Sequence, residues 1–294
     1  MRFVLQVMRY MHMFDTHCHL NFKIFKDNID AVIKSAQSVG MTHFVVPGTD
    51  IKTSKKAVEI AQQYGQVYAA VGIHPHHVFD VMQNQESKIK NQNDNLKIII
   101  KEIKTLMASG KVVAIGEIGL DKHHYATTKY EAYHTYNDFI NIQKFFLIKQ
   151  LDLARKHNKS VILHNREAKD EFLKVINENW EEYFRGRMVL HCCEADDNLL
   201  DFAIKHEIFI GVDGDVTFSK SKQEFIKKVP LDLLVLETDS PFLLPEPLKS
   251  QKKYPNVPAN LIYIIEYVAR LMKESVDKIA QETTNNGKRL FNLH

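Results

Sequence analysis

Short apolar runs rich in β-branched residues alternate with longer helical patterns from one end of the chain to the other. Strands separated by helices are typical of a parallel sheet, because parallel neighbours require a crossover connection. Eight runs read as strands: Met13–His17, His43–Pro47, Val67–Gly72, Val112–Gly116, Ser160–Leu163, Met188–His191, Ile208–Val212 and Leu233–Glu237. The pattern therefore predicts an α/β protein, and eight strands favour a closed (β/α)8 TIM barrel.

An open doubly wound sheet is the alternative fold for this order of elements. Such a sheet places a glycine-rich dinucleotide loop directly after its first strand. No loop of that kind follows the first apolar run. The closed barrel is therefore the favoured architecture.

Two segments differ from the short, regular spacing. The longest helical pattern lies between Tyr130 and His157, and its apolar side chains share one face that predicts core contacts: Phe139, Ile142, Phe146 and Leu153. Residues 83–97 read QNQESKIKNQNDNLK and have no apolar face before Leu96. We expect this stretch to be a solvated loop insertion.

The 294 residues read as one domain over residues 13–294, preceded by an amino-terminal extension of residues 1–12. With 45% hydrophobic residues the chain can bury a single large core, and barrels often reach this length undivided. The net charge of +3 excludes binding of nucleic acid by a strongly basic surface. Any contact with phosphate must therefore be local.

Three cysteines, Cys18, Cys192 and Cys193, are too few and too unevenly placed for a disulfide framework. We expect free thiols in a reducing compartment. The apolar run Phe3–Val7 is too short for a signal peptide and is soon followed by Arg9. No stretch approaches the roughly 18 apolar residues that a bilayer requires. The expected location is the cytoplasm, with the nucleus as the alternative, without membrane association or an obligate protein partner.

The first strand carries two histidines near its carboxyl end, in the order Asp15-Thr16-His17-Cys18-His19. Because side chains alternate along a strand, Asp15, His17 and His19 point one way and Cys18 the other. Two histidines so spaced can bind one metal ion together. For such a pair alone, solvent-facing or hydrogen-bonded histidines are the commoner explanation.

Four further metal-capable residues stand at the ends of other strands: Glu117, His164, His191 and Asp239. Active sites of barrels lie at the carboxyl ends of the strands, so this coincidence favours a metal site. Four histidines and two carboxylates suffice for two divalent ions if one carboxylate bridges them. Such donors suit Zn²⁺, Mn²⁺ or iron and permit Mg²⁺ with retained waters, and the sequence does not choose among these metals. A pair of ions is suited to hydrolysis by phosphoryl transfer.

Six motifs make the chain resemble the TatD family of metal-dependent deoxyribonucleases, within the wider amidohydrolase-like barrels. They are FDTHCHL at the start, VGIHPH around His74, AIGEIGLD around Glu117, LHNREA around His164, ETDSPFL around Asp239 and TTNNGKRLF near the end. The resemblance extends from about Phe14 to Phe291. Several of these motifs are specific to the family on their own, and their order along the chain strengthens the resemblance.

The resemblance implies a division of the ligands between two ions. One ion would be held by His17, His19, Glu117 and Asp239, and the other by Glu117, His164 and His191. Glu117 would bridge the ions, and Asp239 would also act as the base for a metal-activated water.

Other residues of the motifs carry implied roles in support of the ligands. His74 and Arg166 look like phosphate contacts, although a salt bridge that shapes the loop explains Arg166 equally well. Asp15, Glu237 and Asp121 are expected to orient metal-bound histidines or nearby backbone. Hydrogen bonds that close loops are the alternative for these three carboxylates.

The chain departs from the family pattern in two places. Where relatives have an aromatic residue and then a small hydroxyl residue with glycine, this chain reads His191-Cys192-Cys193-Glu194. A carboxylate expected near the last helix is missing, since the chain reads Asn256-Val257-Pro258. We do not expect a thiolate ligand, because the ligand set is complete without the cysteines and alternation turns only one of them toward the site. Asp213 and Asp215 read as turn residues around Gly214.

The expected activity is hydrolysis of DNA phosphodiester bonds by a two-metal mechanism, as a 3′-to-5′ exonuclease on DNA that is single-stranded or has a free 3′ end. A metal-dependent hydrolase of a small amide, lactone or phosphoester is the alternative on the same scaffold. A non-catalytic binding protein is a third reading, which the complete ligand set disfavours. The sequence leaves open whether the role is DNA repair, apoptotic fragmentation or degradation of external DNA.

Overall fold

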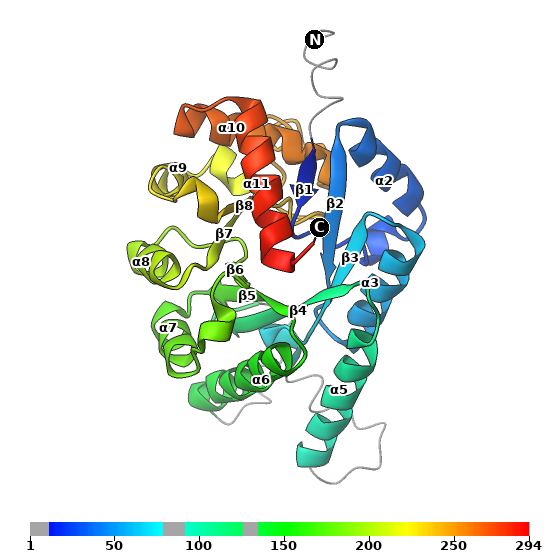
Figure 1. Ribbon diagram of the computed structural model, residues 1–294, viewed down its shortest axis with the longest axis vertical. Coiled ribbons are helices and arrows are strands. Elements are labelled where there is room, and N and C mark those ends of the chain that lie inside the picture. Colours follow the sequence, from blue (N-terminus) through cyan, green and yellow to red (C-terminus); the bar gives the residue numbers. More distant parts are fainter. Residues whose placement is uncertain (1–11, 79–91, 126–134, 294) are drawn as a thin grey trace.

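The computed structural model describes residues 12–78, 92–125 and 135–293. Within these ranges one eight-stranded sheet runs in sequence order, and each neighbouring pair of strands is parallel. Helices form a ring outside the strands, as Figure 1 shows. The prediction of a (β/α)8 barrel is confirmed.

The strands fall on the eight apolar runs. They are β1 (Met13–Asp15), β2 (Met41–Pro47), β3 (Val67–Val71), β4 (Val112–Asp121), β5 (Ser160–Arg166), β6 (Met188–Leu190), β7 (Phe209–Val212) and β8 (Leu234–Leu236). The α-helices are α2 (Ile29–Ser38), α3 (Ile51–Gln63), α5 (Gln92–Met107), α6 (Tyr136–Lys156), α7 (Lys169–Glu178), α8 (Asp197–His206), α9 (Lys220–Ile226), α10 (Leu261–Met272) and α11 (Val276–Phe291). In the part of the chain that the structure covers, no helix is long and apolar enough to cross a bilayer.

Strands β4 and β5 continue beyond their predicted ends at Gly116 and Leu163. After a register shift between Ile115 and Ile118, β4 pairs with β5 as far as Asp121. The side chain of Gln143 on α6 accepts from the backbone N–H of Asp121 and donates to its carbonyl, at 2.9 and 3.0 Å. This support holds the extended end of β4 in place, so Glu117 lies inside a strand rather than at its last residue.

The helical pattern between residues 130 and 157 corresponds to α6, whose residues Phe139, Phe146 and Leu153 are buried as predicted. Residues 130–134 lie outside the described part of the chain.

The prediction that residues 83–97 form a loop is wrong for the last residues of this segment. Residues 83–91 lie outside the described ranges, but residues 92–97 form the beginning of α5. Ile99, Ile103 and Met107 follow at helical spacing and are buried. This buried row anchors the helix, which extends backward through polar residues that contribute no apolar face of their own.

Each strand contributes one side chain to an inner core that fills the barrel. These side chains are Phe14, Val45, Ala70, Ala114, Ile162, Val189, Phe209 and Val235. Leu290 and Phe291, at the end of α11, pack against the same core. A second, larger core lies between the strands and the surrounding helices. Because side chains fill the inside of the barrel, the polar residues at the strand ends gather over a closed floor.

Hydrogen bonds just beyond the strand ends join β1 to β8. The backbone N–H of Thr16 donates to Leu236, that of Asp239 to His17 and that of His19 to Ser240, at 3.1, 2.9 and 2.7 Å. The Asp15 carboxylate accepts from the backbone N–H and the hydroxyl of Thr238, at 3.0 and 2.6 Å. We call this set of contacts the β1–β8 seam. It places the residues after β1 directly beside those after β8.

The close approach of β4 and β5 at Gly119 gives a test of this arrangement. A Cβ at Gly119 would lie 1.8 Å from the carbonyl oxygen of His164. We expect Gly119→Ala to lower the free energy of unfolding by about 1–3 kcal/mol, because the backbones must move apart. Gly110→Ala is the control, since nothing lies within 4 Å of its added Cβ. Urea unfolding of both variants measures the effect, and equal midpoints would contradict the contact.

Candidate metal centre

Four histidines and two carboxylates from five different strands meet at the carboxyl end of the barrel. They line or adjoin a cavity of about 840 Å³. His17 and His19 follow β1, Glu117 lies on β4, His164 on β5, His191 follows β6 and Asp239 follows β8. The structure therefore brings together the six residues that the strand-end pattern singled out.

Glu117 lies at the centre of this group, and its two oxygens face different histidines. Oε1 is 2.7 Å from His164 Nδ1 and 3.2 Å from His191 Nε2. Oε2 is 3.6 Å from His17 Nε2 and 3.9 Å from His19 Nε2. A carboxylate oriented in this way can serve two cations at once.

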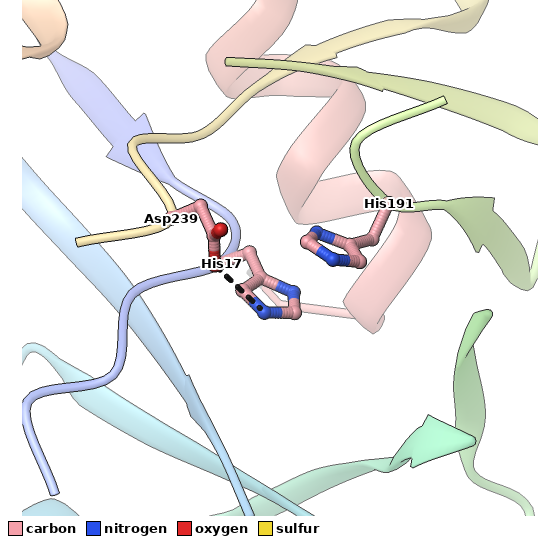
Figure 2. Close-up of side chains that lie close together, drawn as sticks. All are labelled: His17, His191 and Asp239. Atoms are coloured by element: carbon pink, nitrogen blue, oxygen red, sulfur yellow. Dashed lines mark ion pairs between the residues drawn. The ribbon is translucent and has the colours of Figure 1, made fainter. Parts of the chain in front are cut away.

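Asp239 closes the group on the side of the first strand. Its Oδ1 is 3.3 Å from His19 Nε2 and 3.6 Å from His17 Nε2. The rings of His17 and His191 stack with centroids 3.7 Å apart, so the two halves of the group touch. Figure 2 shows His17 between Asp239 and His191.

The spacing of the ring nitrogens fits a divalent cation. Two nitrogens bound to one ion at about 2.0–2.1 Å lie about 2.9–3.4 Å apart, depending on the bond angle. His17 Nε2 and His19 Nε2 are 3.2 Å apart. Among the residues that the structure covers, the Nδ1 atoms of both rings are buried without a hydrogen-bond partner. The Nε2 atoms of both rings thus lie together with Glu117 Oε2 and Asp239 Oδ1, each within 3.9 Å of both oxygens.

Two carboxylates orient the histidines on the other side of Glu117. Asp121 Oδ2 is 2.9 Å from His164 Nε2, and Glu237 Oε1 is 3.1 Å from His191 Nδ1. In both rings the nitrogen that faces Glu117 is therefore fixed by a contact at the opposite nitrogen. Both carboxylates lie where a carboxylate that supports a ligand is expected.

Asp15 acts on the backbone rather than on a ring. Its Oδ1 accepts from the N–H of His17 at 3.2 Å, and both of its oxygens contact Thr238 across the seam. Burial raises the pKa of Asp15 to about 8, although the hydrogen bonds from Thr238 oppose this shift. This carboxyl group thus fixes the turn that carries the first two histidines.

Burial and neighbouring charges determine the protonation of Glu117 and of the histidines around it. Burial alone would raise the pKa of Glu117, but His191 and His74 hold this pKa well below its usual range. Burial likewise opposes charge on His191, yet Glu117 and Glu237 raise the pKa of the ring well above its ordinary value. Burial also opposes charge on His164, but Asp121 and Glu117 raise its pKa to about 9. A cation that enters must therefore displace protons from these rings.

His74 lies beside Glu117, and one hydrogen bond sets its tautomer. The backbone N–H of His76 donates to His74 Nδ1 at 3.1 Å, so the ring proton belongs on Nε2. This Nε2 is 3.5 Å from Glu117 Oε1 and borders the cavity. Burial holds the pKa of His74 well below its ordinary value. The ring is a neutral hydrogen-bond donor at the edge of the metal group.

Arg166 is exposed at the rim of the cavity. Its guanidinium donates to the hydroxyl of Tyr125 at 2.7 Å and lies 5.3 Å from the centre of that ring. No carboxylate of the described residues lies within ion-pair distance of it. The salt-bridge reading of Arg166 therefore has no support here.

The loop after β6 differs from the family pattern and connects to β5. Glu194 accepts from Asn165 Nδ2 at 2.6 Å and from the backbone N–H of Glu167 at 2.9 Å. Cys192 borders the cavity while Cys193 is buried, so only one thiol of the pair faces the site. Glu194 thus links the loop that follows β6 to the end of β5 and the loop after it.

A buried ion pair in the cavity wall was missed by sequence reasoning. Lys222 Nζ on α9 is 3.3 Å from Asp215 Oδ2, and both residues line the cavity. Burial raises the pKa of Asp215 to about 7, with Asp213 adding to the shift and Lys222 opposing it. Asp213 has the expected turn role, because its Oδ1 accepts from the N–H of Asp215 at 2.8 Å. Local sequence gave no signal that Lys222 would reach the site.

Comparisons with known proteins show which family this chain resembles along its length. The family model described as TatD related DNase matches residues 14–292. An uncharacterized metal-dependent hydrolase of Bacillus subtilis, YabD, is 32% identical over 96% of this chain and 100% of its own. The 3′-5′ ssDNA/RNA exonuclease TatD of Escherichia coli is 30% identical over 96% of this chain and 99% of its own.

A solved structure gives the same result for the fold. The TatD homologue YJJV of Escherichia coli superposes with a TM-score of 0.79 at 26% identity, covering 98% of this chain and 100% of that one. Family model, relatives and structural neighbour thus agree over almost the entire chain. The chain therefore belongs to the TatD family and is a metal-dependent hydrolase of ester bonds.

Proposed function

We propose that this protein is a deoxyribonuclease that holds two divalent ions and shortens single-stranded DNA from its 3′ end. The observation that carries the proposal is the position of Glu117, whose two oxygens face two separate pairs of histidines. The exonuclease relative, 30% identical over nearly the whole chain, supports the choice of a nucleic acid as substrate.

The proposed ligands fall into two sets, one around each oxygen of Glu117. His17, His19, Asp239 and Glu117 Oε2 would hold one ion, and His164, His191 and Glu117 Oε1 the other. Two divalent ions, when bound, would make a water molecule more acidic and offset the negative charge that develops on the phosphoryl oxygens. Mg²⁺, Mn²⁺ and Zn²⁺ all accept such mixed nitrogen and oxygen donors.

Asp239 is the carboxylate suited to accept the proton of the attacking water. Its side chain is 13% exposed, against 4% for Glu117, and it borders the cavity. Glu117 is surrounded by imidazoles and has less access to water. Asp239 would therefore combine ligation with general base catalysis.

His74 and Arg166 would hold the phosphodiester. His74 Nε2 offers a neutral N–H beside Glu117, and Arg166 presents its guanidinium at the rim. His74 inside the cavity and Arg166 at its rim can each donate to oxygens of the phosphate backbone. Because these contacts involve charge, binding should weaken as salt concentration rises, and because few charged groups take part the dependence should be shallow.

The decisive experiment follows the digestion of DNA labelled at its 5′ end. Protein stripped by a chelator should leave the strand intact, and restored Mg²⁺, Mn²⁺ or Zn²⁺ should produce a ladder that shortens stepwise from the 3′ end. A labelled RNA strand belongs in the same assay. Intact strands under every metal would overturn the nuclease proposal in favour of a small amide, lactone or phosphoester substrate. Internal cuts would overturn the exonuclease assignment alone.

Glu117→Ala should abolish turnover and remove both ions, because it deletes the shared carboxylate. Loss of a residue that merely supports a ligand costs about 10- to 100-fold in metal affinity or activity, so the loss here should exceed about 100-fold. Metal content measured by mass spectrometry, together with the DNA assay, checks this result. Glu178→Ala on the exposed face of α7 is the control. Half of the wild-type rate in Glu117→Ala would be incompatible with a bridge.

Asp239→Asn should preserve the fold but reduce kcat, because the amide retains the shape of the side chain without its basicity. General base catalysis contributes about 10²- to 10⁴-fold, so kcat should fall within that range. Steady-state kinetics at saturating metal separates kcat from KM. A change confined to KM would contradict the proposed role.

A further inference from the structure

We propose that Phe242 and Phe22 form a subsite that holds the terminal base of the substrate by stacking. The inference rests on the proposed function and names the part of the nucleotide that the site recognises. It predicts that an unpaired base, rather than phosphate alone, determines how tightly the strand end binds.

The two rings form one wall of the cavity that contains the metal group. Phe22 stacks on His19 with centroids 4.4 Å apart and an interplanar angle of 20°. Phe242 meets Phe22 nearly edge to face, with centroids 5.9 Å apart and an angle of 75°. Both phenylalanines line the cavity together with Glu117 and Asp239. An aromatic surface thus begins directly beside a proposed ligand ring.

The backbone fixes the position of Phe242 relative to Asp239, the proposed general base. Its N–H donates to the carbonyl of Asp239 at 2.8 Å, within the turn that follows β8. On the opposite side, the ring of Phe22 packs against His19, so neither phenylalanine depends on a distant loop for its position. A base placed on this wall would therefore have a defined relation to the reacting phosphate.

The exposure of Phe242 distinguishes it from other phenylalanines. Phe242 is 50% exposed, whereas most phenylalanines of the chain are buried. The other exposed phenylalanines in the described ranges, Phe145 and Phe218, each have a lysine ammonium over the ring. The ring contacts of Phe242 are with His19 and Phe22, at the cavity. A single exposed aromatic residue is ordinary, but one that continues an active-site wall is a candidate for binding.

The chemistry of two other residues that line the cavity indicates a nucleotide as the occupant. Arg166 and His74 offer donors suited to phosphate, and the phenylalanines offer only aromatic surface. A ligand that contacts both kinds of lining residue carries a phosphate and a flat ring, as a nucleotide does. Stacking accepts every base, because each has a π-face, and it requires that the base be unpaired. The subsite would thus favour single strands without reading their sequence.

The test compares ligands that differ only in the base. Calorimetry on the Mn²⁺-loaded protein measures the Kd of deoxyadenosine 5′-monophosphate and of 2-deoxyribose 5-phosphate. Stacking on an aromatic side chain corresponds to about 5- to 150-fold in affinity, so we expect the nucleotide to bind about tenfold more tightly or better. In the cleavage assay, a strand that ends in an abasic residue should show a correspondingly higher KM than a normal strand.

Three variants test whether the preference for a ligand with a base depends on the ring of Phe242. Phe242→Leu keeps an apolar side chain but removes the π-face, and it should reduce the preference for the base to within about threefold. Phe242→Trp should retain the preference, which separates stacking from a general disturbance of the loop. Phe145→Leu on α6 is the matched control, because its ring is similarly exposed and does not line the cavity. Thermal melting of each variant confirms that it is folded.

The outcomes separate the subsite from the nuclease activity. A wild-type preference that survives in Phe242→Leu, or no preference in the wild type, overturns the subsite even if DNA is cleaved. A preference that depends on Phe242, in a protein that cleaves no strand under any metal, supports the subsite and overturns the proposed nuclease.

Discussion

Glu117 is a carboxylate almost completely removed from water, and the arrangement of the site follows from that fact. A buried negative charge is costly unless positive charge or hydrogen-bond donors lie close to it. The barrel meets this requirement because its strands converge at their carboxyl ends, where five histidine rings surround the two oxygens. Protons on these rings can balance the charge, and so can cations. The site is thus a buried acidic centre whose positive counter-charge is exchangeable.

Much of the fold could be predicted because the strands of a barrel are buried on both faces and read as continuous apolar runs. The prediction failed where local pattern stops being informative. The end of β4 contains Gly116, Gly119 and Asp121, and it is held in the sheet by Gln143 from α6, which lies distant in sequence. The start of α5 is polar and depends on apolar residues later in the same helix. In both cases a contact outside the local window decides the structure.

The proposed ligands were accessible to sequence reasoning for a different reason. Metal-capable residues are conspicuous when they recur at strand ends, and the barrel topology alone brings those ends together. The cavity walls have no comparable signal. Lys222 reaches the site from α9, and Phe242 differs from other phenylalanines in that its exposed ring lines the cavity. Burial of a lysine and exposure of an aromatic ring are properties of the tertiary structure, which a list of residue types does not contain.

The β1–β8 seam has a consequence for how the protein is made. Asp15 and Thr238, which meet there, are 223 positions apart in the chain. Contacts over such separations form only after a large loop has closed. During synthesis the amino-terminal histidines leave the ribosome long before Asp239 does. A nascent chain therefore carries an incomplete set of the proposed ligands for most of its translation. The complete set of proposed ligands arises when the last strand reaches the first, so a half-made chain lacks the arrangement that the proposed metal site requires.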